Sequence, residues 1–447
     1  MIYVDIIFLL TGAIICAFLS IFAVASIGEK KLRAAILSAV LLVIVYAVWF
    51  EGYFIYIPDP EILLYILIAI TLLFALFFLP IGQTRSMEIG ELSEKVDERD
   101  IIFAREEYLP GTEKYEKYYS EHPELKDKDD RIRNLPELLE PGGKYYNPEL
   151  AVKIGAKFEI IENMLERVDG EANQLPVAVD RDKMTSEIKD LTRRLGADDV
   201  GIAELDPMFV YSHVGRGPDK WGAPINNNHN YVIAFTMEMD YDHVEQAPRL
   251  PITDETATQY LRGALISIHI AAFIRSLGYP ARAHIAGSNY QIMLPPAACV
   301  AGLGEMGRLG YLITPKFGPR IRLGAVTTDL PLVPDKPVKF GVQDFCRICK
   351  KCAINCPSGA IPTGDKTDVR GVVKWQLDIE RCFHYWRAAG SDCGLCMRVC
   401  PFSHPPTFTH NIVRAGIKRS SFARRVSLWG DDIFYGKNII KSGTLIE

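Results

Sequence analysis

The sequence predicts a mixed α/β protein with three apolar N-terminal helices, an α/β middle region and a small cysteine-rich module. Three observations support this prediction. Long runs without charge fill most of the first 80 residues, helix-like and strand-like segments alternate from 185 to 335, and eight of the ten cysteines fall between Cys346 and Cys400. Such alternation favours a layered α/β fold over a helical bundle.

The N-terminal apolar runs have the length of membrane-spanning helices. Residues 6–28 carry no charged side chain, and residues 34–50 and 62–80 repeat this pattern. About 20 apolar residues are needed to cross the hydrocarbon layer of a bilayer. The first run is too long for a cleaved signal peptide, lacks a basic start and is followed by two more. We therefore expect three transmembrane helices and a lipid bilayer as partner.

The charges of the connecting loops predict the orientation of these helices. The first loop, 29–33, contains three basic residues, whereas the second loop, 51–61, contains no Lys or Arg. By the positive-inside rule the first loop lies in the cytoplasm. We expect a multi-pass protein of the cytoplasmic membrane, with everything after residue 84 on the cytoplasmic side. No twin-arginine export signal precedes the first run.

The eight clustered cysteines form two runs that each end in Cys-Pro. The first run reads Cys-x2-Cys-x2-Cys-x3-Cys-Pro, and the second reads Cys-x10-Cys-x2-Cys-x3-Cys-Pro. This spacing is typical of two 4Fe–4S clusters, in which the fourth cysteine of each run serves the other cluster. The predicted ligands are Cys346, Cys349, Cys352 and Cys400 for cluster 1, and Cys356, Cys382, Cys393 and Cys396 for cluster 2.

Disulfides and a zinc ribbon are the alternatives for these cysteines. Four-ligand zinc sites usually show two pairs of cysteines rather than a run of four followed by Pro. Iron–sulfur thiolates stay reduced until the cluster is built, which favours assembly in the cytoplasm. The two remaining cysteines, Cys16 and Cys299, have apolar neighbours in the sequence and are expected to be small core residues.

Composition divides the chain into five parts. Residues 85–184 are rich in charge and are expected to form a solvated, partly helical wrapping segment. Lysines and arginines (50) nearly balance aspartates and glutamates (55), so no nucleic-acid partner is implied. The predicted parts are a membrane anchor at 1–84, the wrapping segment at 85–184, an α/β core at 185–340, a cluster module at 341–404 and a tail without clear pattern at 405–447.

Several elements of the core can be predicted. Residues 185–204 indicate an amphipathic helix, a glycine stop and a short strand. Residues 230–239 and 321–332 are rich in β-branched and apolar residues and predict strands, and residues 281–294 predict a strand, a turn and a second strand.

One helix of the core has the clearest start and stop signals. Asp254 or Thr256 is its expected N-cap, and Gly278 is its expected end. Helical spacing is shared by apolar residues expected on one face, namely Leu261, Leu265, Ile268 and Ala272.

The sequence also contains a G-x-G-x-x-G motif at Gly302, Gly304 and Gly307. A dinucleotide site needs a preceding strand and a following helix. Here two prolines precede the motif and more Gly and Pro follow it, which argues against a nicotinamide cofactor. We interpret the three glycines as backbone lying close to a flat bound cofactor, or as a tight turn.

Several segments, in their order along the chain, resemble the reductive dehalogenases. The resemblance covers residues 95–404 and rests on DERDIIFAR, PGT, YYSEHPELK, FIRSLGYPA, GLGEMGRLGYLITPKFGPRIRL, TDLPL and the two cysteine runs. It implies a nitroreductase-like α/β core that binds base-off cobalamin, and a ferredoxin-like module with two 4Fe–4S clusters. The N-terminal helices resemble the small membrane-anchor subunit of such enzymes, here fused to the chain. This fusion and the missing export signal depart from the exported members.

The resemblance further implies the reaction and its residues. Halide would be removed from an organohalide by the Co(I) state of cobalamin, with electrons from the two clusters and a proton from a tyrosine. A cation beside that tyrosine would stabilise the phenolate left after donation. The implied catalytic residues are Tyr260 as donor, Arg322 as its cation and Asn289 as a polar partner. Tyr290 and Arg320 are their competitors, and the alternative for Tyr260 is a surface hydroxyl.

Two histidines and a pair of residues in the second loop lie outside the implied catalytic group. Base-off cobalamin needs no histidine ligand, so His269 and His284 are expected to be core or surface residues. A quinol site near Glu51 and Tyr53 remains a hypothesis, with a ferredoxin-type electron donor as the alternative. Two other function classes stay open: an epoxyqueuosine-reductase-like corrinoid enzyme, and a non-catalytic membrane-tethered electron carrier.

Overall fold

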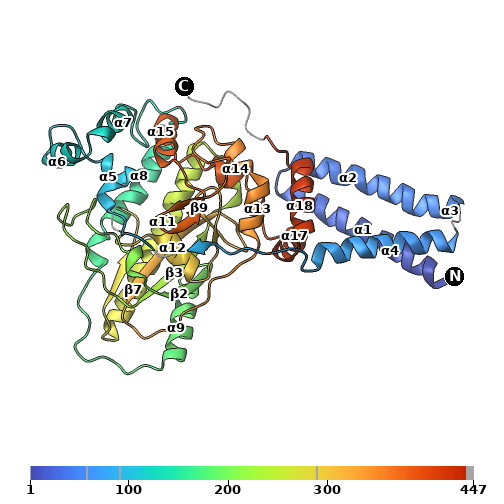
Figure 1. Ribbon diagram of the computed structural model, residues 1–447, viewed down its shortest axis with the longest axis horizontal. Coiled ribbons are helices and arrows are strands. Elements are labelled where there is room, and N and C mark those ends of the chain that lie inside the picture. Colours follow the sequence, from blue (N-terminus) through green and yellow to red (C-terminus); the bar gives the residue numbers. More distant parts are fainter. Residues whose placement is uncertain (1, 57–58, 90–91, 288–289, 439–447) are drawn as a thin grey trace. The chain divides into compact units, whose positions relative to one another are not determined.

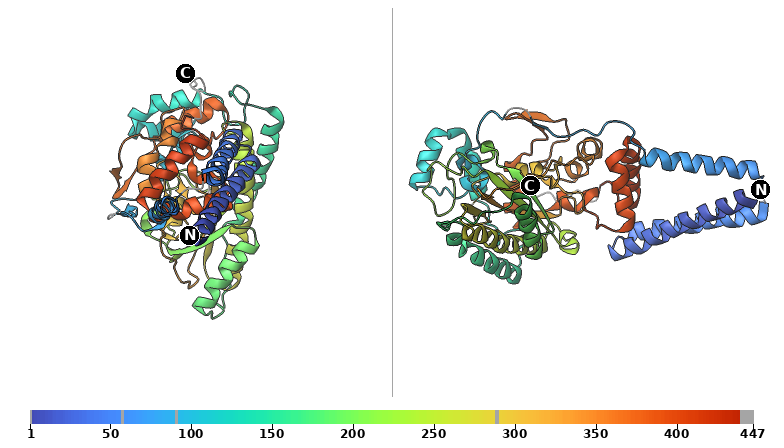
Figure 2. Two further views of the ribbon diagram at one scale, coloured as in Figure 1. Left: turned by 90° about the vertical axis from the view of Figure 1, so that its right-hand side faces the viewer. Right: turned by 90° about the horizontal axis from the view of Figure 1, so that it is seen from below.

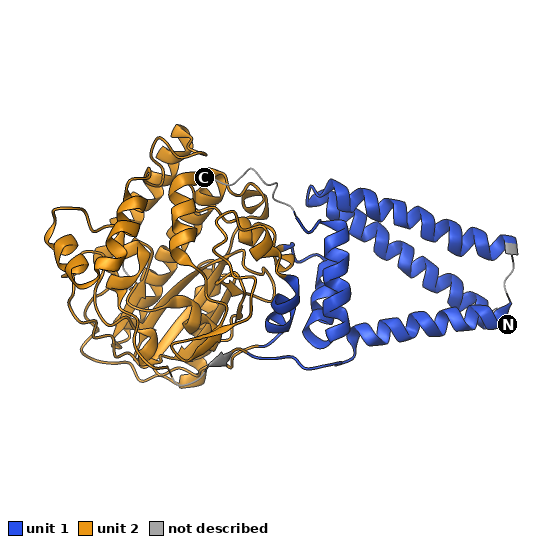
Figure 3. Cartoon of the chain, turned by 45° about the horizontal axis from the view of Figure 1, so that its top comes forward, with its two compact units in different colours: residues 1–86, 339–349, 404–439 blue, residues 87–338, 350–403, 440–447 orange. Residues whose placement is uncertain are grey.

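The computed structural model describes residues 2–56, 59–89, 92–287 and 290–438 (Figure 1). The chain forms two compact units, coloured separately in Figure 3. Unit 1 combines residues 1–86, 339–349 and 404–439. Unit 2 consists chiefly of residues 87–338 and 350–403. The tail and the start of the cysteine-rich module therefore fold with the N-terminal helices.

Three long helices of unit 1 meet the expectation for membrane spans. They are α1 (Ile2–Gly28), α2 (Leu32–Tyr46) with its extension, and α4 (Pro60–Phe78). Their candidate spans, Tyr3–Gly28, Leu32–Ile55 and Pro60–Phe78, have mean hydropathies of 2.7, 2.3 and 2.6. The structure thus confirms three helices that are long and apolar enough to cross a membrane.

The predicted loop at 51–61 is wrong in its first half. Helix α2 continues through a π-helical turn at Ala47–Glu51 into α3 (Gly52–Tyr56), so Glu51 and Tyr53 lie within a helix. The apolar pattern ends near residue 50, but the helical backbone hydrogen bonding extends to Tyr56. Asp59 then caps α4 by accepting a hydrogen bond from the amide of Glu61 at 2.9 Å.

The tail, for which no pattern was expected, contains two helices. These are α17 (Phe408–Arg419) and α18 (Ser421–Phe434), and they lie across one end of the long helices of unit 1 (Figures 1 and 2). Thr407 and Ser420 cap them. The Ser420 hydroxyl also donates to the carbonyl of Leu76 in α4 at 2.7 Å. Basic residues interrupt the apolar spacing of this segment, which hid both helices from pattern reading.

Unit 2 is organised around a four-stranded antiparallel sheet with the order β2-β3-β7-β4. Strands β2 (Asp199–Glu204), β3 (Tyr231–Glu238) and β7 (Ile321–Thr328) confirm the strands expected in 185–204, 230–239 and 321–332. Helix α9 (Arg181–Arg194) confirms the helix expected before β2.

The expected strand–turn–strand at 281–294 is only half right. Strand β4 (Ala281–His284) forms, but the second strand is reduced to a single bridge between Ile292 and Val210. Helix α12 (Leu294–Val300) begins here instead, with proline in its first turn. Proline lacks an amide proton for strand pairing and is well suited to the start of a helix.

Helix α11 (Leu250–Ser276) starts earlier than its cap signals suggested. Arg249 is the N-cap residue and makes no side-chain cap, while Asp254 lies inside the helix and pairs with Lys157 at 2.7 Å. Thr256 is also internal. The predicted end is confirmed, because Gly278 follows the last turn with a φ of 88°.

The predicted apolar face of α11 is only partly right, because Leu261 and Ile268 pack against the core but Leu265 does not. Leu265 is 55% exposed, whereas Ala264, Ile270 and Ile274 are buried against the sheet. The helix is apolar on more than one side, so spacing alone could not identify the side that packs. Helix α8 (Pro148–Glu162) also packs against α11, which uses a further part of its surface.

The wrapping segment contains a small core of its own. Helices α5 (Ile102–Arg105), α6 (Glu113–Glu121) and α7 (Pro123–Arg133) confirm its partly helical character. It is not merely solvated, because it buries a cluster of aromatic side chains. These are Tyr108, Tyr115, Tyr118 and Tyr119.

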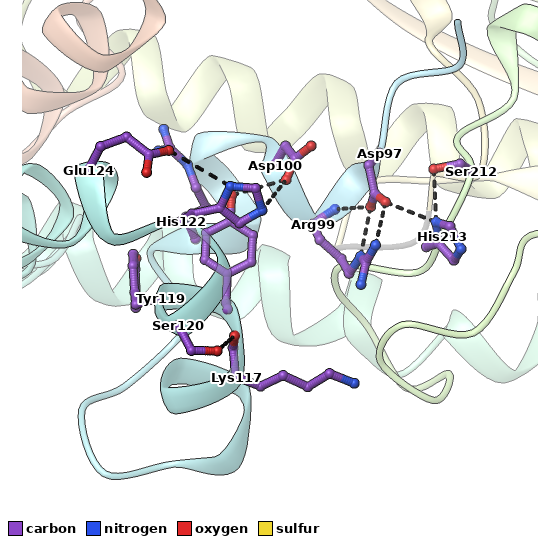
Figure 4. Close-up of polar contacts among 12 residues, drawn as sticks. Asp97, Arg99, Asp100, Lys117, Tyr119, Ser120, His122, Glu124, Ser212 and His213 are labelled. Carbon is purple, nitrogen blue, oxygen red and sulfur yellow. Dashed lines mark hydrogen bonds and ion pairs between the residues drawn. The ribbon is translucent and has the colours of Figure 1, made fainter.

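Buried and surface ion pairs hold this segment. The Arg105 guanidinium and Asp129 lie 3.3 Å apart, at 3% and 1% side-chain exposure. Figure 4 shows Asp97 between Arg99 (2.8 Å) and His213 (2.9 Å), which joins the segment to a loop of the core. Arg99 and His213 help to hold the pKa of Asp97 below its usual value against the opposing effect of burial.

Unit 2 also contains a second sheet and several short helices. A three-stranded sheet has the order β1-β9-β8. Its strands are β1 (Glu88–Ile89), β8 (Thr367–Val369) and β9 (Val372–Lys374), and the short helices are α10 (Tyr241–Val244), α14 (Lys351–Ile354), α15 (Ile379–Ala389) and α16 (Leu395–Arg398). Helix α13 (Val342–Cys349) belongs to unit 1.

Replacing Asp129 with Ala should lower the free energy of unfolding by about 2–3 kcal/mol, because the buried guanidinium of Arg105 loses a partner. Asp127→Ala, an exposed change on the same helix, should stay within about 0.5 kcal/mol of wild type. Urea unfolding followed by tryptophan fluorescence measures both variants. Equal stability of the two variants would contradict this role for the buried pair.

Candidate iron–sulfur and redox site

The structure brings together the four cysteines predicted for cluster 2. Cys356, Cys382, Cys393 and Cys396 line one cavity in unit 2. Helix α15, capped by Asp378, carries Cys382 in its first turn, and α16 carries Cys396. Cys356 lies two residues after the end of α14. The fourth cysteine of the first run therefore lies with three cysteines of the second run.

One of these cysteines lies in a turn with an unusual backbone conformation. Cys393 has a φ of 58° and Gly394 a φ of 69°, so consecutive residues adopt the left-handed conformation. A Cβ at position 394 would collide with the side chain of Ile252. Non-glycine residues at positive φ persist where the surroundings impose them, often at functional sites.

The electrostatics of this cavity suit bound cations. Burial raises the pKa of Cys382 to about 12, and burial and the neighbouring sulfurs raise the pKa values of Cys393 and Cys396. Without a compensating charge these thiols would be protonated at neutral pH. Iron ligation requires thiolates and stabilises them by its own positive charge. The four side chains therefore fit a 4Fe–4S cluster.

The ligand set of cluster 1 stays a prediction. Cys346 and Cys349 belong to unit 1, and Cys352 and Cys400 belong to unit 2. Outside both sets, Cys299 is buried in the core of unit 2, as expected. Cys16 lies half-buried in α1.

Tyr260 and Arg322 meet beside the cluster-2 cavity. The Arg322 guanidinium carbon lies 5.5 Å from the centroid of the Tyr260 ring. Arg322 Nη2 donates to Asp392 Oδ2 at 3.0 Å and to Thr256 Oγ1 at 2.6 Å. Asp392 precedes Cys393 and lines the same cavity as the cysteines. The guanidinium therefore connects the cluster-2 residues to the tyrosine.

The Arg322 side chain retains one open donor. Its Nε is buried and has no hydrogen-bond partner within the described part of the chain. Burial lowers the pKa of Arg322, but nearby Tyr260 and Asp392 outweigh this effect and leave the pKa above its ordinary value. A permanently charged cation with a free donor suits stabilisation of a phenolate or an anionic reaction partner.

The structure separates the two competing arginines. Arg320 is fully buried and donates to the carbonyls of Ser403 (2.7 Å) and Met239, and it pairs with Glu238 at 3.0 Å. These contacts bind the sheet to the module. Arg322 lies two residues further along the chain, within β7, and points to the face on which Tyr260 lies.

The two competing tyrosines are neighbours. Tyr290 lies within electrostatic reach of Tyr260 and Arg322, and burial raises its pKa strongly. Deprotonating Tyr290 is therefore costly. Asn289 falls outside the described residues.

Sequence reasoning missed two residues of this site. Asp392 fixes Arg322 and also accepts a hydrogen bond from Thr253 at 2.8 Å. Tyr311 lies near the sulfurs of Cys382 and Cys396, which add to the effect of burial in raising its pKa. Adjacency to Cys393 was the only sequence signal for Asp392, and Tyr311 had none beyond its glycine-rich surroundings.

The three motif glycines are explained by packing within the chain. Gly302 adopts a φ of 79°, and its amide donates to the carbonyl of Cys299 at 3.1 Å. A Cβ at Gly304 would collide with the carbonyl of Ile313, and one at Gly307 would meet the Ile313 side chain at 2.5 Å. This favours the tight-turn interpretation, and the cofactor-binding role of the glycines gains no support from these contacts.

The two histidines considered earlier lie outside this site. His284 is fully buried, and one of its ring nitrogens lies 3.0 Å from the Thr327 hydroxyl. Burial holds its pKa well below the usual value, so it is a neutral core residue. His269 is exposed on α11.

Fold and site together define an iron–sulfur protein whose cluster module adjoins a polar site on an α/β core. Comparison with known proteins agrees. Residues 345–404 match the family described as 4Fe-4S dicluster domain. The chain is 34% identical over 291 residues to the tetrachloroethene reductive dehalogenase of Sulfurospirillum multivorans, covering 58% of each chain. It is 35% identical over 281 residues to that of Desulfitobacterium hafniense, covering 52% of this chain and 50% of the relative.

Solved structures of reductive dehalogenases are similar to this chain as well. The catabolic reductive dehalogenase NpRdhA in complex with 3-bromo-4-hydroxybenzoic acid aligns with a TM-score of 0.65 at 26% identity, covering 82% of this chain and 51% of that one. A structure titled for a mechanism of B12-dependent dehalogenation aligns with a TM-score of 0.64 at 26% identity, covering 81% of this chain and 51% of that one. The chain spans about half the length of the relatives it matches. Its fold is that of the reductive dehalogenases.

Cys356→Ser should remove one cluster and leave the other. Iron per chain is expected to fall from about eight atoms to about four, because a 4Fe–4S cluster needs all four thiolates. Cys299→Ser is the matched control, since this buried thiol lies outside both ligand sets, and it should keep the full iron content. Iron and sulfide analysis measures both. Full iron occupancy in Cys356→Ser would refute the assigned ligand set.

Proposed function

We propose that this chain is a membrane-associated reductive dehalogenase that replaces a carbon-bound halogen with hydrogen. The observation that supports this proposal most directly is that Tyr260, Arg322 and Asp392 form one group beside the cluster-2 cysteines. The similarity to reductive dehalogenases supports the same activity. The substrate class is an organohalide.

The reaction consumes two electrons and one proton. Carbon–halogen cleavage releases halide, and the carbon that held it gains hydrogen. The clusters pass electrons one at a time, which suits a two-electron reduction in two steps. Cobalamin, when bound, supplies the low-potential cobalt chemistry that breaks the carbon–halogen bond.

The residues of this chain supply the proton and hold the charge. In the proposal Tyr260 donates its hydroxyl proton, and the Arg322 guanidinium stabilises the phenolate that remains. Asp392 and Thr256 are positioning residues, because they fix the guanidinium at 3.0 and 2.6 Å. Asn289 is proposed as a polar partner of the substrate.

The polar group formed by Tyr260 and Arg322 supports the binding of a corrinoid. The unpartnered Nε of Arg322 and the half-buried Tyr260 leave donors available for a bound cofactor and substrate. If the corrinoid contacts Gly302, Gly304 and Gly307, it does so through their backbone N–H and C=O groups. Other atoms of the chain fill the space beside their Cα atoms.

Membrane association and orientation form the second part of the proposal. The three apolar helices hold the enzyme in the cytoplasmic membrane as a multi-pass protein, and the basic residues of the first loop favour a cytoplasmic catalytic part. Electrons would come from a quinol in the membrane or from a ferredoxin-type protein.

Tyr260→Phe should retain both clusters and the corrinoid but lose at least 100-fold in dehalogenation rate, because general acid catalysis contributes about 10²–10⁴-fold. Tyr279→Phe is the matched control, since its hydroxyl only donates to the carbonyl of Val177 at 3.0 Å. Halide release driven by an artificial low-potential donor measures both variants. Unchanged turnover in Tyr260→Phe, with loss in Tyr290→Phe, would transfer the role to Tyr290.

Proteolysis of membrane vesicles tests the orientation. In inside-out vesicles the part of the chain after residue 84 should be digested, whereas right-side-out vesicles should protect it. Immunoblotting of the fragments reports the outcome. Protection in inside-out vesicles would place the catalytic part on the outer side, and release of the intact chain by alkaline carbonate would exclude membrane spanning.

A further inference from the structure

Unit 1 contains a buried group of potential metal ligands that the proposed dehalogenation does not use. Glu29 follows α1, His404 precedes α17 and His410 lies in its first turn. Their ligand atoms all lie within 4.8 Å of one another. The side chains are only 3%, 12% and 9% exposed. We infer that Glu29, His404 and His410 form a binding site for a divalent transition-metal ion, with Zn²⁺ as its probe.

The distances within the group suit a metal ion. Glu29 presents one oxygen to each imidazole, at 3.4 Å from His404 Nδ1 and 3.3 Å from His410 Nδ1. In a tetrahedral zinc site with bonds of about 2.0–2.2 Å, neighbouring ligand atoms lie about 3.3–3.6 Å apart. Two histidines and one glutamate form a three-ligand set known from zinc and non-haem iron sites, which leaves a coordination position open.

The group is also poorly satisfied without a cation. Among the described residues, neither oxygen of Glu29 nor Nδ1 of His404 makes a hydrogen bond of suitable geometry, although all three atoms are buried. A buried carboxylate without hydrogen bonds is costly unless a charge pairs with it. These unsatisfied atoms belong to the same residues whose ligand atoms lie close together, which supports an ion site independently of the residue types.

The Nε2 atom of each histidine contacts a further polar side chain. His404 Nε2 lies 3.2 Å from Asp431, and His410 Nε2 lies 3.1 Å from the Tyr435 hydroxyl. Metal-bound histidines usually use the other ring nitrogen in this way, which fixes the ring and its tautomer. Asp431 and Tyr435 both belong to the segment at the end of α18.

Ion binding requires two small rearrangements. The two imidazole rings are parallel, with 4.7 Å between their centroids, and must tilt toward each other to direct both Nδ1 lone pairs at one ion. The Thr407 hydroxyl, 2.8 Å from His410 Nδ1, must turn away. Both changes are side-chain rotations within a site that joins the α1–α2 connection to the tail helices. The bound ion would therefore fasten these segments together.

The test uses the full-length protein in detergent with complete iron occupancy, so that free cysteines do not bind zinc. After chelator treatment, Zn²⁺ is titrated and metal per chain is measured. Wild type should bind one zinc ion per chain. Glu29→Gln and His410→Gln should weaken binding at least 100-fold. Asp431→Asn, which changes a residue that contacts His404 instead of the ion, should weaken binding about 10–100-fold.

A matched variant and a spectroscopic readout complete the design. His122→Gln alters a partly exposed histidine of unit 2 that lies near Asp100 and Glu124, and it should bind zinc as wild type does. X-ray absorption at the zinc edge should show nitrogen and oxygen ligands at about 2.0–2.1 Å and no sulfur at about 2.3 Å.

Three results would overturn the inference. These are a wild-type protein with full iron that binds no zinc, equal binding by wild type and Glu29→Gln, and a sulfur shell around the zinc. Unchanged iron content in every variant shows that the fold is intact, so loss of zinc reports the site itself.

Discussion

The burial of four thiols beside a buried arginine–aspartate pair is the constraint on which the site depends. Cys356, Cys382, Cys393 and Cys396 line one cavity, and Asp392 at its edge holds Arg322 at 3.0 Å. Buried sulfur ligands require compensating positive charge, and a buried guanidinium requires a carboxylate. One short turn satisfies both needs, since Asp392 and Cys393 are consecutive. The electron-carrying ligands and the candidate proton donor are thereby placed next to each other.

The antiparallel sheet and α11 create the other half of this arrangement. Arg322 lies in strand β7 and Arg320 immediately precedes it, and both arginines contact the cluster module. Arg320 donates to a carbonyl group of the module, whereas Arg322 faces Tyr260 on α11. The start of this strand thus provides one arginine that fixes the module and one that remains chemically available. Neighbouring residues of one type acquire different roles because their partners differ.

Unit 1 has two notable features, namely the apolar surface of its long helices and a buried acidic residue at their end. Its three long helices expose apolar side chains over most of their surface, which is unfavourable in water and suits a lipid environment. At their end, α17 and α18 surround Glu29 with histidine and aspartate side chains. A buried acidic residue at the end of a long apolar helix needs a positively charged partner, which the inferred metal ion supplies. The tail folds in the same unit as the three long helices.

The sequence alone determined the features that depend on local composition and spacing. Apolar run length identified the three long helices, cysteine spacing indicated a module for two 4Fe–4S clusters, and β-branched runs identified β3 and β7. Tertiary structure alone decided which of Arg320 and Arg322 faces Tyr260, which side of α11 is buried, and that Glu29 meets His404 and His410. These pairings join residues far apart in the chain, so their partners are set by packing, and no local pattern records them. The tail helices were missed because basic residues interrupt their apolar spacing.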